Sequence, residues 1–180
     1  MNMQFRDTSG VFFTITSNYY VLGWHGCTFE NSGTGTGAIK VSLCQDMIIE
    51  DCRFLGNPVF TTAIQISGNH YRSIIRHNYI GATTNGILID SASVGYGNYI
   101  EGNIIGRSMT DPSSSAQMTY GIRSAKADGH SGFMMVNNRI EAVDGISFAH
   151  TSGTNETDAC LGNICSQVGV GSSEVDYTTP

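Results

Sequence analysis

Residues 74–81 read Ile-Ile-Arg-His-Asn-Tyr-Ile-Gly and residues 99–106 read Tyr-Ile-Glu-Gly-Asn-Ile-Ile-Gly, so one pattern returns after 25 residues. The central Asn belongs to a column that extends along the chain in steps of 25, 26, 25, 35 and 25 residues. Its members are Cys27, Cys52, Asn78, Asn103, Asn138 and Asn163. Self-similarity at a period of this size predicts stacked structural repeats.

Apolar residues accompany this Asn/Cys column at fixed offsets, and their spacing indicates strands. Three residues before the column lie Trp24, Ile49, Ile75, Ile100, Met135 and Cys160. Two residues after it lie Phe29, Phe54, Ile80, Ile105, Ile140 and Cys165. A second apolar pair follows at 39/41, 64/66, 87/89, 122/124, 146/148 and 168/170, and Met3 and Phe5 mark an earlier unit. A spacing of two, broken by Gly, Asn and Ser clusters, is typical of short β-strands.

These patterns predict an all-β fold, a single-stranded right-handed parallel β-helix of about six to seven coils, each of about 25 residues. Coils would stack at about 4.8 Å, so that inward side chains form columns and the Asn amides hydrogen-bond along an inward Asn/Cys ladder. We expect the β-helix to span residues 1–170, with an insertion loop at 107–118 and a polar C-terminal tail at 171–180.

Composition narrows the partners. The 180 residues suit one domain, and the net charge of −6 argues against nucleic acid as the main partner. No apolar run reaches the roughly 18 residues of a membrane span, and residues 1–20 lack the pattern of a signal peptide. The His and Cys residues lack metal-ligand spacing, so neither metal nor cofactor is predicted. Four of the five cysteines fall on inward columns, which favours buried free thiols and folding in a reducing cytoplasm.

The two quoted units, each followed by Gly-Ile at 86–87 and 121–122, resemble parallel β-helix repeats of the pectin-lyase-like superfamily. That superfamily includes polysaccharide lyases and hydrolases, uronan epimerases and the shafts of bacteriophage tailspikes. The resemblance covers roughly residues 20–170 and is strongest to the shaft of a tailspike or another virion β-helix protein. Because the matching residues form the coils, the resemblance implies a fold and transfers no catalytic motif.

Candidate catalytic residues lie just before the Asn/Cys column. Glu50 and Glu101 occupy the same position two coils apart, roughly 9–10 Å at the strand spacing. That is near the upper limit of the roughly 6.5–9.5 Å between the carboxylates of inverting glycosidases. Asp51 and His77 add a candidate base. Because Arg76 lies between the two glutamates, we favour a Glu–Arg–Glu salt-bridge ladder over a catalytic pair.

Candidate binding residues lie on the outer surface. Tyr79 should stack near Arg53, as a sugar platform, a cation–π pair or a packed surface aromatic. Arg107 and Asp111 belong to the insertion, and insertions in repeat proteins often carry binding.

Two classes of function remain. We favour a non-enzymatic virion protein, either a tail-spike or fibre shaft or a capsid-surface decoration protein. It would be made in the host cytoplasm and form homo-oligomers, most simply trimers, with other virion proteins and host surface polysaccharide as further partners. We expect a partner chain, a trimer mate or further sequence to cover the solenoid ends. The alternative is an extracellular polysaccharide depolymerase, a glycoside hydrolase or lyase, and a non-catalytic adhesin is a third class.

Overall fold

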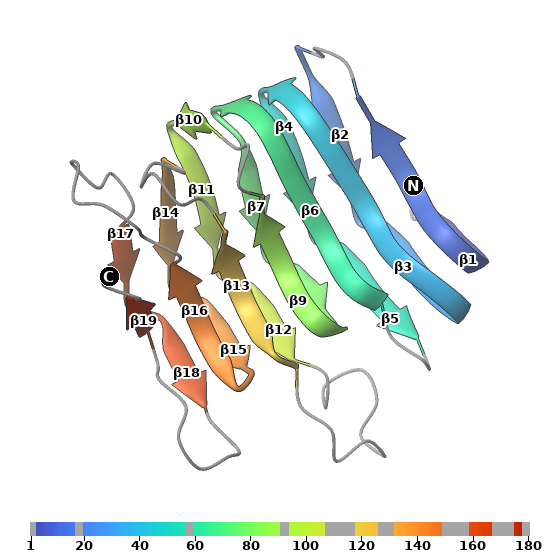
Figure 1. The fold of residues 1–180 in the computed structure, drawn as a ribbon. Coiled ribbons are helices and arrows are strands. Elements are labelled where there is room, and N and C mark those ends of the chain that lie inside the picture. The colour runs from blue at the N-terminus through green and yellow to red at the C-terminus, as the bar shows by residue number, and fades with distance from the viewer. Residues whose placement is uncertain are drawn as a thin grey trace.

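The structure is a computed structural model that describes residues 3–16, 20–56, 60–90, 94–106, 118–125, 132–148, 159–166 and 175–177. These residues form a parallel β-solenoid of about five turns and contain no helix (Figure 1). The predicted all-β parallel class is therefore confirmed. The turn count is lower than the predicted six to seven coils because six stacked strands of one face are separated by only five complete turns.

One face of the solenoid is a six-stranded parallel sheet. Its strands, in spatial order, are β17 (Ala159–Leu161), β14 (Phe133–Val136), β11 (Asn98–Glu101), β7 (Ile74–Arg76), β4 (Met47–Glu50) and β2 (Leu22–His25). Neighbouring strands are about one coil apart in sequence, so each strand stacks on its counterpart in the next repeat.

The other two faces belong to one 13-stranded sheet, because the long strand β3 (Thr28–Gln45) runs through the corner between them. Its first half continues into β5 (Arg53–Gly56), β8 (Tyr79–Ile80), β12 (Ile104–Gly106), β15 (Arg139–Glu141) and β18 (Ile164–Ser166). Its second half continues into β6 (Phe60–Tyr71), β9 (Ala82–Ile89), β13 (Tyr120–Ser124), β16 (Asp144–Phe148) and β19 (Val175–Tyr177). Strand β1 (Gln4–Ile15) pairs with β3, and β10 (Val94–Tyr96) pairs with β6.

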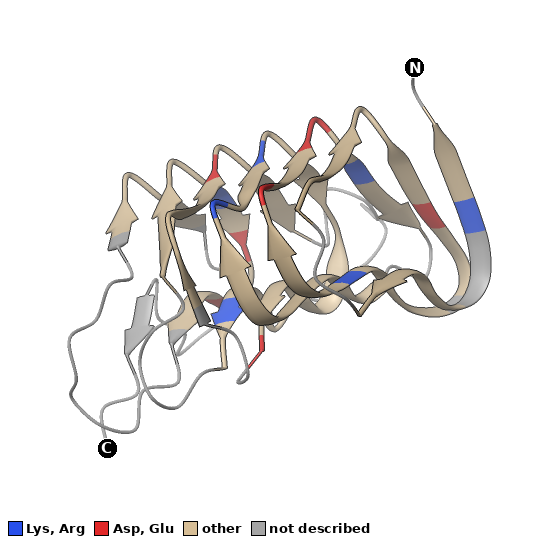
Figure 2. Cartoon of the chain, turned by 90° about the horizontal axis from the view of Figure 1, so that it is seen from above, with Lys and Arg blue, Asp and Glu red and all other residues tan. Residues whose placement is uncertain are grey.

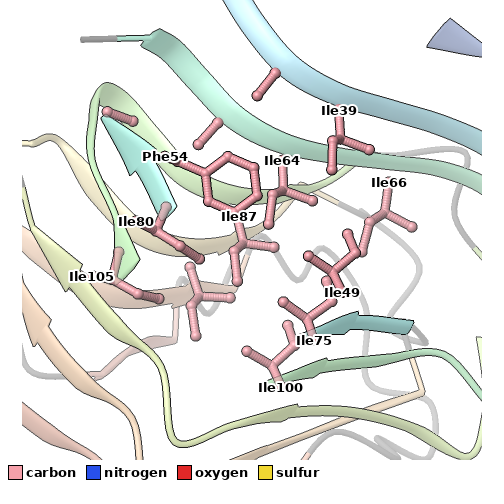
Figure 3. Close-up of a cluster of buried hydrophobic side chains, with 14 of the residues drawn as sticks. Ile39, Ile49, Phe54, Ile64, Ile66, Ile75, Ile80, Ile87, Ile100 and Ile105 are labelled. Atoms are coloured by element: carbon pink, nitrogen blue, oxygen red, sulfur yellow. The ribbon is translucent and has the colours of Figure 1, made fainter. Parts of the chain in front are cut away.

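The core is a set of side-chain columns, one from each face. Figure 3 shows Ile49, Ile75 and Ile100 from the six-stranded sheet facing the rows that come from the other two faces. An aromatic column continues the interior, in which the Phe29 ring stacks on Phe5 at 5.3 Å and on Phe54 at 4.9 Å between centroids. These residues lie where the two-residue spacing placed them.

The Asn ladder is present and buried. The amide nitrogen Nδ2 of Asn103 donates to Oδ1 of Asn138, and Asn138 donates likewise to Asn163, both at 2.9 Å. The same nitrogen of Asn103 also donates to the carbonyl oxygen of Ile75, so both of its protons are used. Each amide thus bridges three successive coils, which fixes their register and satisfies polar groups that would otherwise be costly to bury.

Left-handed backbone conformations make the corners. The residue before each ladder position has φ between 53° and 63°, in the order Gly26, Asp51, His77, Gly102, Asn137 and Gly162. A second corner, which leads into the six-stranded sheet, has φ between 55° and 69° at Asp46, Arg72, Gly97 and Gly132. Gly, Asn and Asp adopt this conformation at least cost, which explains the polar breaks between the apolar segments.

Two sequence expectations need correction. Met118, which we assigned to the end of the insertion loop, is a fully buried core residue. Val175–Tyr177, which we assigned to a polar tail, forms β19 and pairs in parallel with β16. Residues 107–117 and 168/170 lie outside the described residues.

The cysteines are free, as predicted. Cys27, Cys44 and Cys52 are buried, whereas Cys160 and Cys165 are half-buried and pack against the core. Burial raises the pKa of Cys44 and of Cys52 to about 11, because the thiolate would lose hydration inside the solenoid. These two thiols therefore act as small apolar side chains.

Candidate functional site

The candidate carboxylates lie along the corner that carries the Asn ladder. Strand pairing aligns His25 with Glu50, Glu50 with Arg76, and Arg76 with Glu101. Because the preceding residue on each strand points into the core, these side chains point outward. Figure 2 shows acidic and basic positions following one another on successive coils at this edge.

Glu50 is engaged on both oxygens. Its Oε1 accepts from Arg76, 2.8 Å from Nε and 2.7 Å from Nη2, and its Oε2 lies 3.2 Å from Nδ1 of His25. The Glu50 side chain is only 18% exposed. A carboxylate held in this way stabilises the stacking of three coils, and a proton or nucleophile role would require it to leave these partners.

Glu101 differs from Glu50. Within the described part of the chain, Arg76 forms its ion pair with Glu50 and none with Glu101. The expected Glu–Arg–Glu ladder is therefore half formed, because one guanidinium in this geometry turns toward a single neighbour. The two carboxylates keep their two-coil separation, which corresponds to roughly 9–10 Å between strands.

Asp51 and His77 occupy neighbouring left-handed positions of the same corner, with φ of 54° and 53°. His77 Nδ1 lies 4.0 Å from Asp51 Oδ1, and the side chains are 54% and 66% exposed. Such an exposed and distant pair contributes little stability and has no enclosing wall. A catalytic role for Glu50, Glu101, Asp51 and His77 stays a prediction.

The candidate binding residues fall into two groups. Arg53 and Tyr79 are opposite each other in register, and the guanidinium carbon lies 5.9 Å from the ring centroid. That distance is at the outer limit of a cation–π contact. Arg107 and Asp111 lie outside the described residues, and the binding role of all four stays a prediction.

A second group of polar and aromatic residues, at the opposite corner of the six-stranded sheet, escaped the sequence analysis. Arg72 forms a two-point salt bridge with Asp46, from Nε to Oδ1 at 2.6 Å and from Nη2 to Oδ2 at 2.7 Å. These hydrogen bonds hold the pKa of Asp46 below its ordinary value. The rings of Tyr71 and Tyr96 lie 4.7 Å apart at 58°. Spacings of 26 and 25 residues within these pairs were the available signal.

Two open hollows are present elsewhere than at the ladder corner. One, of about 180 Å³, is lined mainly by β3 and β6 and includes Thr36, Lys40, Thr62 and Gln65. The other, of about 120 Å³, includes Tyr96, Gly97, Tyr99 and Met134. Neither contains a candidate catalytic residue, so the corner carboxylates sit outside both hollows.

The described residues hold no group of three or more His, Cys, Asp or Glu side chains placed to share a metal ion, and no helix able to cross a bilayer. Comparison with protein-family models, with curated proteins and with solved structures finds no match for this chain.

Proposed function

We propose that this chain is a non-enzymatic structural protein of a bacteriophage virion, with the β-helix of the pectin-lyase-like superfamily as its scaffold. It would form a segment of a tail-spike or fibre shaft, or decorate the capsid surface, and would contact host surface glycan. The observation that carries this proposal is the Asn ladder. Asn78, Asn103 and Asn138 each donate to the next coil and to a backbone carbonyl, which makes a rigid rod rather than a flexible binding site.

The acidic residues support a structural role. Both oxygens of Glu50 are paired with cations of the adjacent coils. Arg6 bonds Glu30 across the next pair of coils at 2.8 Å, and Arg72 bonds Asp46 at the far corner. Charged residues on three separate edges are thus used to tie coils together, which is what a load-carrying shaft requires.

Exposed apolar residues support assembly with other copies. Leu161 and Ile164 flank the ladder corner of the last described coil, and they are 59% and 67% exposed. Large apolar side chains adjacent to each other on a surface favour burial against a protein partner. A homo-oligomer, most simply a trimer, would bury them.

The location can be tested on phage particles. Antibodies against this chain should label purified virions of the phage that encodes it in immunogold electron microscopy, and the chain should remain with particles through a density gradient. Particles from a phage with the reading frame deleted provide the control. Recovery only in the soluble fraction of the lysate would contradict the proposal.

A polysaccharide depolymerase is the second candidate function, and the observation that favours it is Glu101. This carboxylate is on the same edge as Glu50 but outside the Arg76 ion pair. If the chain is a hydrolase or lyase, Glu101→Gln should abolish clearing of a capsule or lipopolysaccharide lawn, whereas Glu30→Gln at a distant ion pair should not. Equal clearing by wild type and Glu101→Gln would remove this site.

A further inference from the structure

The corner that leads into the six-stranded sheet has a step in it. Successive coils place Asp46, Arg72, Gly97 and Gly132 at the same left-handed position. Two long charged side chains are therefore followed by two positions without any side chain. Gly132 must be glycine, since a Cβ there would meet the carbonyl oxygen of Gly95 at 1.9 Å. Gly97 is not crowded, because the nearest atom to a Cβ would be Arg72 Cγ at 3.8 Å.

The step opens into the hollow of about 120 Å³, which we call the tyrosine notch. Its lining residues are Tyr96, Gly97, Asn98, Tyr99, Gly132 and Met134. This volume would hold about four water molecules at the share of about 30 Å³ that each occupies in the liquid, which is comparable to one sugar ring. The notch is thus too small for a protein side-chain cluster and too open for an apolar cofactor.

Two tyrosines form walls of the tyrosine notch. Tyr96 is 70% exposed and Tyr99 is 41% exposed, which is unusual for such large side chains on a rigid sheet edge. Tyr71 packs against Tyr96 at 4.7 Å between centroids and limits its rotation. A braced, solvent-exposed aromatic ring offers an apolar face with little ordering cost, and its hydroxyl supplies a hydrogen-bonding edge.

The adjacent Arg72–Asp46 pair supplies complementary polar groups. Nε and Nη2 of Arg72 bind the carboxylate, so three of the five guanidinium N–H groups are left for other acceptors. Each Asp46 oxygen keeps lone-pair capacity for a donor. The side chains are 60% and 41% exposed, and the pair holds them in one geometry. Paired hydroxyl groups, each both donor and acceptor, match this arrangement.

We infer that the tyrosine notch binds a neutral pyranose unit of a surface glycan, with the apolar face of the sugar on Tyr96 and its hydroxyls on Arg72 and Asp46. The net charge of −6 disfavours polyanionic chains, both uronic acid polymers and nucleic acids. A protein partner would need roughly 800 Å² of surface on each side, far more than this notch provides. The inference rests on the glycan-contact part of the proposed function and gives it a location.

Two variants test the tyrosine notch without disturbing the core. Tyr96→Ala removes the aromatic wall. Gly97→Asn fills the step, and Asn tolerates the left-handed backbone that this position requires. Tyr79→Ala is the matched control, since it removes an outward tyrosine from another edge of the solenoid. Melting temperatures should show that all three variants are folded.

The assay is a titration of the labelled protein with neutral hexose oligosaccharides (gluco-, galacto- and manno-configured, α- and β-linked), followed by amide NMR shifts and calorimetry. We expect at least one oligosaccharide to bind saturably and to shift the amides of Gly97 and Gly132. Affinity should fall at least about tenfold in Tyr96→Ala and Gly97→Asn and stay unchanged in Tyr79→Ala, with polygalacturonate binding more weakly.

Several results would overturn this inference: no saturable binding by the panel, equal binding by the two notch variants, or loss of binding in Tyr79→Ala alone. A lower light-scattering mass for Tyr96→Ala would instead identify the face as an interface between copies. Virion labelling is independent of these measurements. An unlabelled virion with an intact, variant-sensitive glycan site refutes the proposed location and leaves the notch standing.

Discussion

Replacing Asn103 by Leu tests the Asn ladder at its centre, where the side chain is fully buried. Asn103 Oδ1 accepts from both the backbone N–H and Nδ2 of Asn78 at 3.0 Å. Its Nδ2 donates to Ile75 O and to Asn138 Oδ1, both at 2.9 Å. Leu has a similar shape and makes none of these four bonds.

The cost follows from what each partner retains. Nδ2 of Asn78 still bonds Ile49 O, and Oδ1 of Asn138 still accepts the Asn103 backbone N–H. The backbone N–H of Asn78 loses its bond without replacement, which costs about 2 kcal/mol, and the three other lost bonds cost about 1 kcal/mol each. Burial of the Leu side chain returns about 2 kcal/mol. The free energy of unfolding should therefore fall by about 3 kcal/mol.

For a chain of this size, a loss of about 3 kcal/mol lowers Tm by roughly 6–12 °C, which circular dichroism melting measures directly. Arg139→Leu is the control, because it introduces the same side chain at an exposed outward position beside the ladder and breaks none of its bonds. Its unfolding free energy should change by less than about 0.5 kcal/mol. Indistinguishable Tm values for the two variants would refute the ladder as a source of stability.

Three further predictions concern the core. Gly121→Ala would place a Cβ 2.1 Å from Ile140 Cγ2 and 2.6 Å from the Gly145 carbonyl oxygen, so its Tm should drop by several degrees; an unchanged Tm would show that the coils are not this close. With pKa values of about 11 against an ordinary 9.0, the Cys44 and Cys52 thiols should react with Ellman's reagent at pH 8 about 100-fold more slowly than exposed thiols, and modification of either at the exposed-thiol rate in native protein would contradict their burial. Burial also lowers the pKa of His70 below 6.5, so the unfolded chain takes up a proton first as pH falls. Stability should be retained above about pH 6.5 and lost below it, by at most about 1.4 kcal/mol per pH unit, and His70→Gln should flatten this dependence; identical pH profiles would argue against a buried neutral imidazole.

The columns could be predicted because inward positions tolerate few residue types. Phe29, Phe54 and Ile80 recur at one offset from the ladder, and the structure pairs them in register. The loop-to-strand connections were less predictable, because loop length between coils is not fixed by packing. Val175 therefore pairs with Ile146 although an apolar pair lies closer in sequence, and Met118 enters the core from beside an insertion.

The candidate site was harder to predict than the core. Outward positions accept almost any residue, so periodicity gives no signal for the contact between Tyr71 and Tyr96 or for the Arg72–Asp46 pair. The column alignment did place Glu50 and Arg76 together. Which glutamate Arg76 would choose depends on side-chain geometry at the corner, which sequence spacing alone does not contain.

Light scattering coupled to size-exclusion chromatography tests the central claim, that the chain is a structural shaft that assembles with its own copies. The chain has a mass of 19.3 kDa. The account predicts an integer multiple of that mass, most simply threefold, and a shift toward the single-chain mass when Leu161 and Ile164 are replaced by Ser. A mass of 19.3 kDa for the wild-type protein at all concentrations would contradict it.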